Sequence, residues 1–235
     1  MMDDLAAVRD DVIRCVRCPR LRRYCEQVAR TKRRAYCEQT YWGKPVPGFG
    51  DPNARLLIVG LAPAAHGGNR TGRIFTGDRS GDFLFAALHR AGFANQPTSI
   101  HRDDGLRLIG AYVAAVVRCA PPDNRPTPRE IENCRDYLMR ELRLLTRLEA
   151  VLALGRIAFD GYLQAELQMG RLTDRRGLHF GHGATHPLGL GLPTLFAAYH
   201  PSQQNTQTGR LTAAMFDDVL MKIKRTAVER PRSTR

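Results

Sequence analysis

The sequence predicts a single α/β domain with a parallel β-sheet and helices on both of its faces. The chain has 235 residues, of which 43% are hydrophobic, and this suffices for one full core. Short apolar runs alternate along the chain with longer segments of helical periodicity. Such alternation is typical of a parallel sheet, because each helix returns the chain to the edge where the next strand begins.

The expected elements follow one another in a regular order. Residues 3–34 read as two short helices interrupted by Cys15–Pro19, and a loop rich in Gly and Pro follows at 42–50. The apolar runs predicted to be strands are 54–61, 111–117, 150–154 and 194–199. The later helices are predicted at about 80–91, 128–147, 156–168 and 209–226.

The limits of the domain follow from this order. Residues 1–223 are expected to form it, and residues 224–235 to form a basic, flexible tail. No apolar run approaches the roughly 20 residues that cross a membrane. The N-terminal residues lack the basic and apolar regions of a signal peptide. We therefore expect a cytoplasmic protein that does not associate with membranes.

The chain is strongly basic, with 36 Lys and Arg residues against 23 Asp and Glu and a formal net charge of +13. This excess suits a polyanionic partner, because each phosphate that the protein neutralises releases counterions and adds affinity. A solvated basic surface without a partner would have the same composition. Nucleic acid is therefore the favoured class of partner.

The chain has six cysteines, which are Cys15, Cys18, Cys25, Cys37, Cys119 and Cys134. In a cytoplasmic protein they are not expected to form disulfides. The first two are spaced for one metal centre, and Cys119 with Cys134 could complete a site for an iron–sulfur cluster or for zinc. Two alternatives stay open on spacing alone. The first four cysteines could form a local zinc site, or the last two could be small buried apolar residues.

The segment Gly60–Asp78 follows the first predicted strand and contains five glycines. Glycine lets the backbone approach a flat ligand, and a helix N-terminus attracts anions. Phe75 could offer its ring to a stacked base. Asp78 has two interpretations. It could cap the helix that follows, or it could orient water and stabilise positive charge on a sugar.

The polar segment Tyr199–Arg210 follows the last predicted strand, at the edge of the sheet where sites gather in such folds. His200 could be a structural hydrogen-bonding residue or a catalytic one. The segment would suit contacts with phosphates and probing of a DNA groove, although an ordinary exposed loop would look alike. The candidate DNA-binding residues are Ser202, Gln203, Gln204, Asn205 and Arg210.

Taken together, these segments resemble the iron–sulfur uracil-DNA glycosylases, and specifically the family 5 branch. The resemblance runs from Cys15 to about Lys224, and three motifs in the right order carry it: Gly60–Asp78, Arg118–Pro128 and His200–Arg210. It implies a four-stranded parallel sheet flanked by helices. It also implies a monofunctional hydrolase that initiates base excision repair. The implied substrates are uracil and other deaminated or damaged bases (hypoxanthine, modified uracils, ethenocytosine) in double-stranded DNA.

The same resemblance implies roles for individual residues. A structural [4Fe–4S] cluster would be held by Cys15, Cys18, Cys119 and Cys134. The catalytic residues would be Asp78, His200 and Asn124. The base would be bound by Phe75, Gly60, Ala62 and Ala115. We expect a monomer in a bacterium or archaeon, associated with the nucleoid through its DNA.

Two departures from the family 4 pattern bear on the substrate. Family 4 has Gly-Glu-Ala-Pro-Gly where this chain has Gly60–Ala64, so that Leu61 replaces an acidic residue. Family 4 also has an Asn that reads the uracil edge, where this chain has Ala115. Both changes agree with family 5. A site that lacks polar readers discriminates less between bases, so a range wider than uracil is implied.

Two other functions remain open. A non-catalytic iron–sulfur module for DNA binding or redox sensing would keep the cysteines and the basic surface without needing Asp78 or His200. A zinc-stabilised hydrolase of small nucleotides is the second alternative. Release of free base from a uracil-containing duplex, without strand cleavage, separates all three functions.

Overall fold

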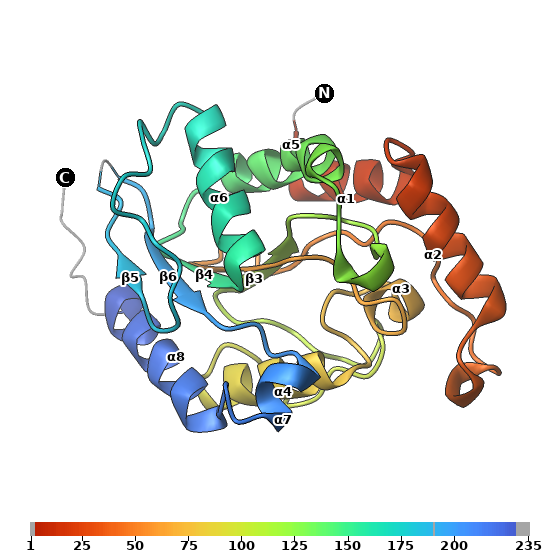
Figure 1. Cartoon of the computed structure of the whole chain (residues 1–235). Helices are drawn as coiled ribbons and strands as arrows, with labels where there is room; N and C mark the ends of the chain where they lie inside the picture. The colour runs from red at the N-terminus through yellow and green to blue at the C-terminus, as the bar shows by residue number, and fades with distance from the viewer. Residues whose placement is uncertain (1–2, 190, 229–235) are drawn as a thin grey trace.

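Six strands form one sheet in the order β1-β3-β2-β4-β6-β5 in the computed structural model, which describes residues 3–189 and 191–228 (Figure 1). The four central strands are parallel: β2 (Leu56–Gly60), β3 (Ala111–Ala115), β4 (Ala150–Leu154) and β6 (Thr194–Ala198). Each edge carries a two-residue antiparallel strand, β1 (Phe49–Gly50) or β5 (Thr185–His186). The predicted α/β domain with four parallel strands is confirmed, and the edge strands are additions.

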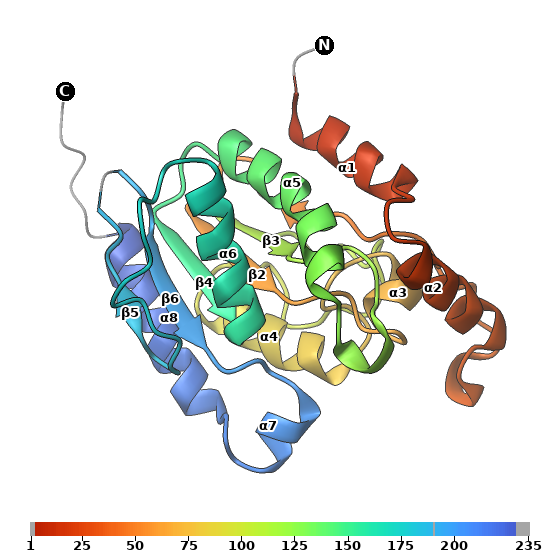
Figure 2. The same ribbon diagram turned by 45° about the horizontal axis from the view of Figure 1, so that its top comes forward.

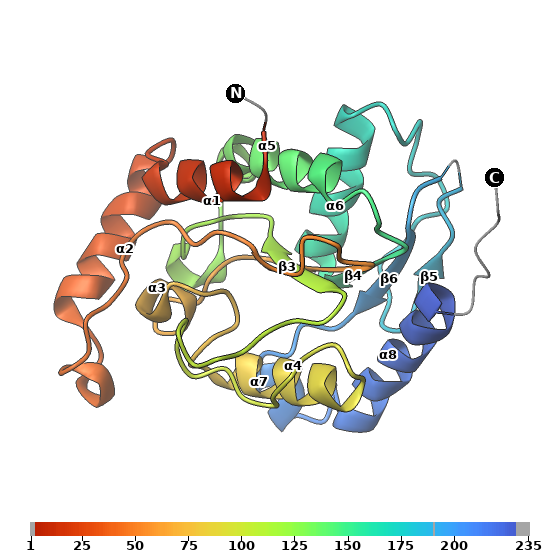
Figure 3. The same cartoon turned by 180° about the vertical axis from the view of Figure 1, so that it is seen from behind.

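Helices cover both faces of this sheet (Figures 1 and 3). One layer contains α1 (Leu5–Arg14), α5 (Pro128–Leu144) and α6 (Arg156–Gln168). The other contains α4 (Arg79–Arg90) and α8 (Ala213–Val228). Beyond the β3 side of the sheet lie α2 (Pro19–Thr31) and the short α3 (Gly68–Thr71), which contact each other. Among the described residues, no helix is long and apolar enough to cross a membrane.

The core has two halves, one on each face of the sheet. Alternate strand residues point to opposite faces, so Leu57 and Val59 pack with α5 and α6, whereas Leu56 and Ile58 pack with α4 and α8. All five residues of β2 are buried. Burial on both faces explains why the central strands appear in the sequence as continuous apolar runs.

The helix boundaries differ from expectation at the C-terminal end. α8 begins at Ala213 and continues to Val228, so residues 224–228 of the predicted tail belong to a helix, and 229–235 lie outside the described residues. The polar loop before it contains a helix that was not predicted, α7 (Gln203–Gln207), which Figure 2 shows set apart from the two helix layers. The Ser202 hydroxyl caps α7 by accepting the N–H of Asn205 at 3.3 Å.

Local capping fixes where α5 starts. The Thr127 hydroxyl accepts the Glu130 N–H at 3.3 Å, and the Glu130 carboxylate accepts the Thr127 N–H at 2.8 Å. This capping box, with Pro128 in the first turn, ends the loop after β3 at a defined point. That loop carries Cys119 and Asn124, two of the predicted site residues.

Candidate active site

A cavity of about 700 Å³ opens where the loops after β2, β3 and β6 meet, at the carboxyl edge of the sheet. Each loop contributes one predicted site residue to its wall: Asp78, Asn124 and Gln203. Side chains from the N-terminal part of the chain, such as Tyr36, close its outer side. Three motifs that are far apart in the sequence therefore converge on one cavity.

Asp78 is both a helix cap and part of the cavity wall. Its Oδ1 accepts the N–H of Gly81 at 2.9 Å, which is the N-cap geometry for α4. Burial raises the pKa of the Asp78 carboxyl, and the backbone N–H groups of Gly81 and Ser80 offset part of that rise. A Cβ added to Gly67 would lie 1.8 Å from Asp78 Oδ2, so only glycine leaves the carboxylate in place. Of the two interpretations from sequence, capping is confirmed and does not exclude a chemical role.

Phe75 lies in the left-handed region with a φ of 53°. A bulky residue pays of order 1–3 kcal/mol for such a conformation, which is common at functional sites. Its ring lies beside that of His200, with 5.7 Å between centroids and 31° between planes. A Cβ on Gly60 would be 2.8 Å from the same ring. The Phe75 side chain is only 6% exposed, so the ring proposed to stack on a base is covered in this structure.

His200 lines a separate cavity of about 370 Å³ with Asn205 and Arg210. Burial lowers the pKa of His200 to about 4, so its imidazole is neutral near pH 7. The Asn205 side chain donates to the His200 carbonyl oxygen at 2.9 Å, and the Arg210 guanidinium stacks on Tyr199 at 4.6 Å. Asp78 and Asn124 thus share the larger cavity, whereas His200 lies in the smaller one and reaches the first motif through Phe75.

Asn124 lies in a strained turn. Asp123 and Asn124 both adopt left-handed conformations, with φ values of 52° and 56°. Asn and Asp enter this region more readily than other residues with side chains, which suits them to the turn. The N–H of Asn124 donates to the Pro121 carbonyl oxygen at 3.2 Å and closes it.

The other predicted base-binding residues lie in the sheet or pack against the core. Ala115 ends β3, pairs with Gly60 in the sheet and is fully buried in the same half of the core as Phe75. Ala62 is half-buried against the opposite half. Neither lines the two cavities described above. Gln204 is exposed on α7.

Arg70 is a site residue that the sequence analysis missed. Its guanidinium donates to the Gly77 carbonyl oxygen at 2.6 Å and, through Nε, to the His66 carbonyl oxygen at 2.7 Å. It also stacks on the Tyr36 ring, with Cζ 4.0 Å from the centroid. Arg70 therefore fixes the peptide directly before Asp78. The available signal was an arginine in the middle of a glycine-rich loop.

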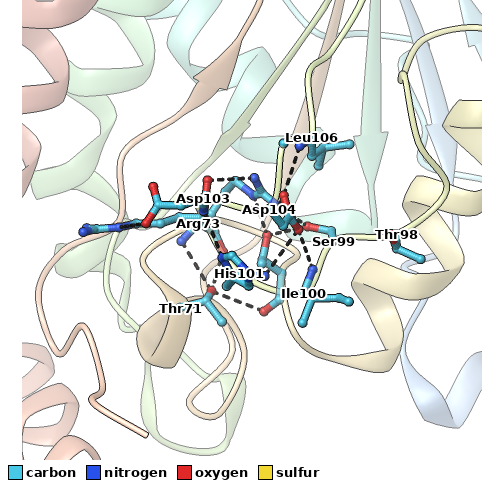
Figure 4. Close-up of polar contacts among 12 residues, drawn as sticks. Thr71, Arg73, Thr98, Ser99, Ile100, His101, Asp103, Asp104 and Leu106 are labelled. Atoms are coloured by element: carbon cyan, nitrogen blue, oxygen red, sulfur yellow. Dashed lines mark hydrogen bonds and ion pairs between the residues drawn. The ribbon is translucent and has the colours of Figure 1, made fainter.

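Arg73 connects the same loop to the segment that contains Ser99 and Asp104 (Figure 4). It forms a buried ion pair with Asp104 and donates to the Ser99 hydroxyl at 2.9 Å and the Thr76 hydroxyl at 3.0 Å. The N–H of Gly77 in turn donates to the Ser99 carbonyl oxygen at 2.8 Å. The segment that carries Phe75 and Asp78 is thereby held from two sides.

The four predicted cluster ligands come from three segments and lie in one region. Cys18, Cys119 and Cys134 are buried in the same half of the core, and Cys15 is half-buried next to Tyr137. A hydrogen bond with Cys134 lowers the pKa of the Cys18 thiol to about 6, and Asn133 donates to Cys18 Sγ at 3.5 Å.

Their arrangement is pairwise. Cys119 is hydrogen-bonded to the spare Cys25, and this contact raises the pKa of the Cys119 thiol. Within 3–189 and 191–228, no three His, Cys, Asp or Glu side chains surround one point as metal ligands do. The thiols match an iron–sulfur cluster in donor type, and they are arranged here as two pairs, Cys18 with Cys134 and Cys25 with Cys119.

The chain matches one protein family and is similar in sequence to several named proteins. Residues 47–224 match the family described as the Uracil DNA glycosylase superfamily. A protein named Type-5 uracil-DNA glycosylase from Mycobacterium tuberculosis is 51% identical over 214 residues, 91% of this chain and 78% of the relative. Proteins of the same name from Thermus thermophilus and Pyrobaculum aerophilum are 52% and 45% identical. The matches cover 91% and 90% of this chain, and 94% and 88% of the relatives.

Proposed function

The chain belongs to the Uracil DNA glycosylase superfamily, and we propose from this membership that it is a uracil-DNA glycosylase of the type-5 branch. Such an enzyme is a hydrolase of DNA repair that cleaves the bond between uracil and its sugar. The observation that carries the proposal is the convergence of Asp78, Asn124 and Gln203, from three separate loops, on one cavity. A cavity formed by loops at the carboxyl edge of a parallel sheet is the expected position for such chemistry.

The reaction requires the target nucleotide to leave the duplex, at a cost of roughly a few kcal/mol. Departure of the base leaves negative charge on the base and positive charge on the sugar. The Asp78 carboxylate would stabilise the sugar and align the attacking water, which its place in the cavity wall allows. His200 would act as a neutral hydrogen-bond donor to the departing base, because its lowered pKa keeps it uncharged.

We further propose that the substrate is double-stranded DNA and that the base range extends beyond uracil to hypoxanthine, modified uracils and ethenocytosine. Ala115 and Leu61 have no side-chain hydrogen-bonding groups to read a base edge. Selection would then rest on backbone contacts, on stacking and on the ease of flipping, which favours mispaired and damaged bases. The product would enter base excision repair, with the enzyme acting as a monomer.

A [4Fe–4S] cluster held by Cys15, Cys18, Cys119 and Cys134 is part of the proposal. Four thiolates are the usual ligand set for such a cluster. The support is that these four thiols lie in one region although they belong to three segments. These are the N-terminal helices, the loop after β3, and α5. A cluster bound there would have a structural role and would take no part in the reaction. It would link these segments and fix the loop that carries Asn124.

The test is the release of free base from a duplex with a single uracil, assayed with and without alkaline cleavage of the resulting abasic site. We expect free uracil and a strand that breaks only after alkali. Asp78→Asn, which keeps an N-capping side chain, serves as the inactive control. Duplex binding without any base release would instead favour a non-catalytic DNA-binding module. Hydrolysis of free nucleotides alone would favour a small-molecule hydrolase.

A further inference from the structure

A third cavity, of about 360 Å³, has a lining that is distinct from that of the candidate active site. Trp42, Lys44 and Arg102 line it, and none of them contributes to the larger cavity around Asp78. Arg70 belongs to its wall and also bonds the Gly77 carbonyl oxygen, whereas Gly77 lines the larger cavity. The two cavities are therefore linked through Arg70, which lines the third cavity and donates to a wall residue of the larger one.

Two cations are gathered on one aromatic ring in this third cavity. Arg102 Cζ lies 4.8 Å from the centroid of the Trp42 ring, and Lys44 Nζ lies 5.6 Å from it. Each contact is a cation–π interaction that restricts a long, flexible side chain. The indole itself is fixed, since its Nε1 donates to the Pro45 carbonyl oxygen at 3.1 Å. The two charges are thus held in place before any ligand arrives, which lowers the entropy lost on binding.

The positive charge of this cavity is only partly balanced by the protein, because its wall contains Arg70, Lys44 and Arg102 but a single acid, Asp103. Arg70 is 8% exposed, and among the described residues no carboxylate oxygen lies within 4 Å of its guanidinium or of the Lys44 ammonium. The acid nearest to Arg102 is Asp103, which is 77% exposed and pairs with it at 3.3 Å. Arg70 donates to three oxygen atoms but has no ionic partner, so its buried charge still favours an anion nearby.

The turn that presents Arg102 is rigid. The Asp104 carboxylate, already paired with Arg73, accepts the N–H of Ile100 at 2.7 Å and of His101 at 3.3 Å (Figure 4). Through Arg73 the same network holds the loop of Phe75 and Asp78. The cationic cavity and the candidate active site are therefore kept at a fixed separation.

We propose that this third cavity binds a backbone phosphate of the DNA strand whose nucleotide enters the active site. Lys44 and Arg102 would contact the phosphate, and the positive charge of Arg70 in the same wall would add to the attraction. The inference rests on the proposed function, because it takes DNA as the ligand. A phosphate held at fixed separation from the cavity of Asp78 would set the register of the strand. It would do so without reading sequence, as phosphate contacts do.

The experiment measures binding to a duplex that carries a tetrahydrofuran abasic analogue, which the enzyme does not cleave. The double variant Lys44→Ala with Arg102→Ala is compared with Arg90→Ala with Lys224→Ala, which removes one ion-paired arginine and one exposed lysine at the far end of α4. A second set of duplexes replaces single phosphates near the lesion with neutral methylphosphonates. Lys44→Arg with Arg102→Lys tests rescue by charge.

We expect the cavity variant to bind about tenfold more weakly and its salt slope to fall by about 0.9 for each phosphate no longer neutralised. One methylphosphonate position should weaken the wild type and leave that variant unaffected. The far-end variant should keep the wild-type slope, and the charge-conserving variant should recover most of the affinity. An unchanged slope, or a variant that still responds to every methylphosphonate, overturns the inference. Uracil release by the wild type, measured in parallel, tests the proposed function separately.

Discussion

Arg73 and Asp104 form a buried ion pair, in which a single nitrogen of the arginine, Nη2, lies 2.8 Å from each carboxylate oxygen. Their side chains are 6% and 7% exposed. The arginine belongs to the loop that carries Phe75, and the aspartate to the segment that leads into β3. One interaction therefore connects two loops on which the geometry of the candidate site depends.

Arg73→Leu should destabilise the protein strongly, because it leaves the Asp104 carboxylate buried without its cation. A loss of about 3–5 kcal/mol in the free energy of unfolding is expected, measured by urea denaturation. Arg90→Leu is the matched control. It breaks the half-exposed pair with Asp217 and should cost at most about 1 kcal/mol. Equal losses in the two variants would show that burial of the Arg73 pair is unimportant.

Asp78→Asn should separate chemistry from structure. Asn is as good an N-cap as Asp, so thermal stability and duplex affinity should stay near those of the wild type. Single-turnover base release should fall by about 10²-fold or more, since the carboxylate charge is lost. A variant that melts at lower temperature and still releases base at the wild-type rate would reduce Asp78 to a helix cap.

The rate of base release should fall at acidic pH as Asp78 becomes protonated, which gives the pH profile an acidic limb. Burial raises the pKa of this carboxyl, so on acidification it takes up its proton at a higher pH than an ordinary aspartate. The rate should therefore be full above this raised pKa and fall as the pH drops through it. The residual activity of Asp78→Asn should lack this limb. His200, with its pKa lowered to about 4, should not contribute a limb near neutrality. A limb shared by the wild type and Asp78→Asn would assign it to another group.

The cysteines should divide into two classes. Protein purified without oxygen is expected to be brown and to contain about four irons per chain. Cys119→Ala should bleach it, because one ligand is lost. Cys37→Ala, which alters an exposed spare thiol, should keep the full iron content. One zinc and no iron in the wild type would contradict the cluster.

The base range should be wide. Single-turnover release from duplexes that differ only in the lesion is expected for uracil, hypoxanthine, modified uracils and ethenocytosine. Ala115→Asn should narrow the range toward uracil if its amide reaches a base edge. Ala115 is fully buried, so melting curves are needed to separate this effect from the cost of an amide placed in the core. A wild type inert on every lesion except uracil would refute the wide range.

The sequence predicted those elements whose pattern is local. The apolar run 150–154 was predicted as a strand and is β4 (Ala150–Leu154), and the helical pattern at 128–147 corresponds to α5 (Pro128–Leu144). The two-residue strands β1 and β5 are too short to show a period and depend on pairing with β3 and β6. Contacts between residues that are far apart in the sequence could not be predicted either, because no local pattern marks them.

Within the site, Asp78 could be selected because it ends a glycine-rich loop and precedes a helical pattern. Arg70 could not be assigned a role, since its contacts with Tyr36 and Gln39 come from a distant segment. The ion pair of Arg73 and Asp104 joins residues 31 positions apart with no periodic signal between them. The contact between Phe75 and His200 likewise exists only once the sheet has formed.

The close approach of Gly60 to the Phe75 ring, and of Gly67 to the Asp78 carboxylate, limits how this enzyme can evolve. Even one added methyl group at either glycine would displace the side chain that it faces, so neither position readily accepts another residue. Gln203 reaches the same cavity from an exposed position on α7, whereas Asn124 is restricted by its left-handed backbone. Lineages that acquire a new lesion preference, and laboratory selections that seek one, should therefore change Gln203 before either glycine.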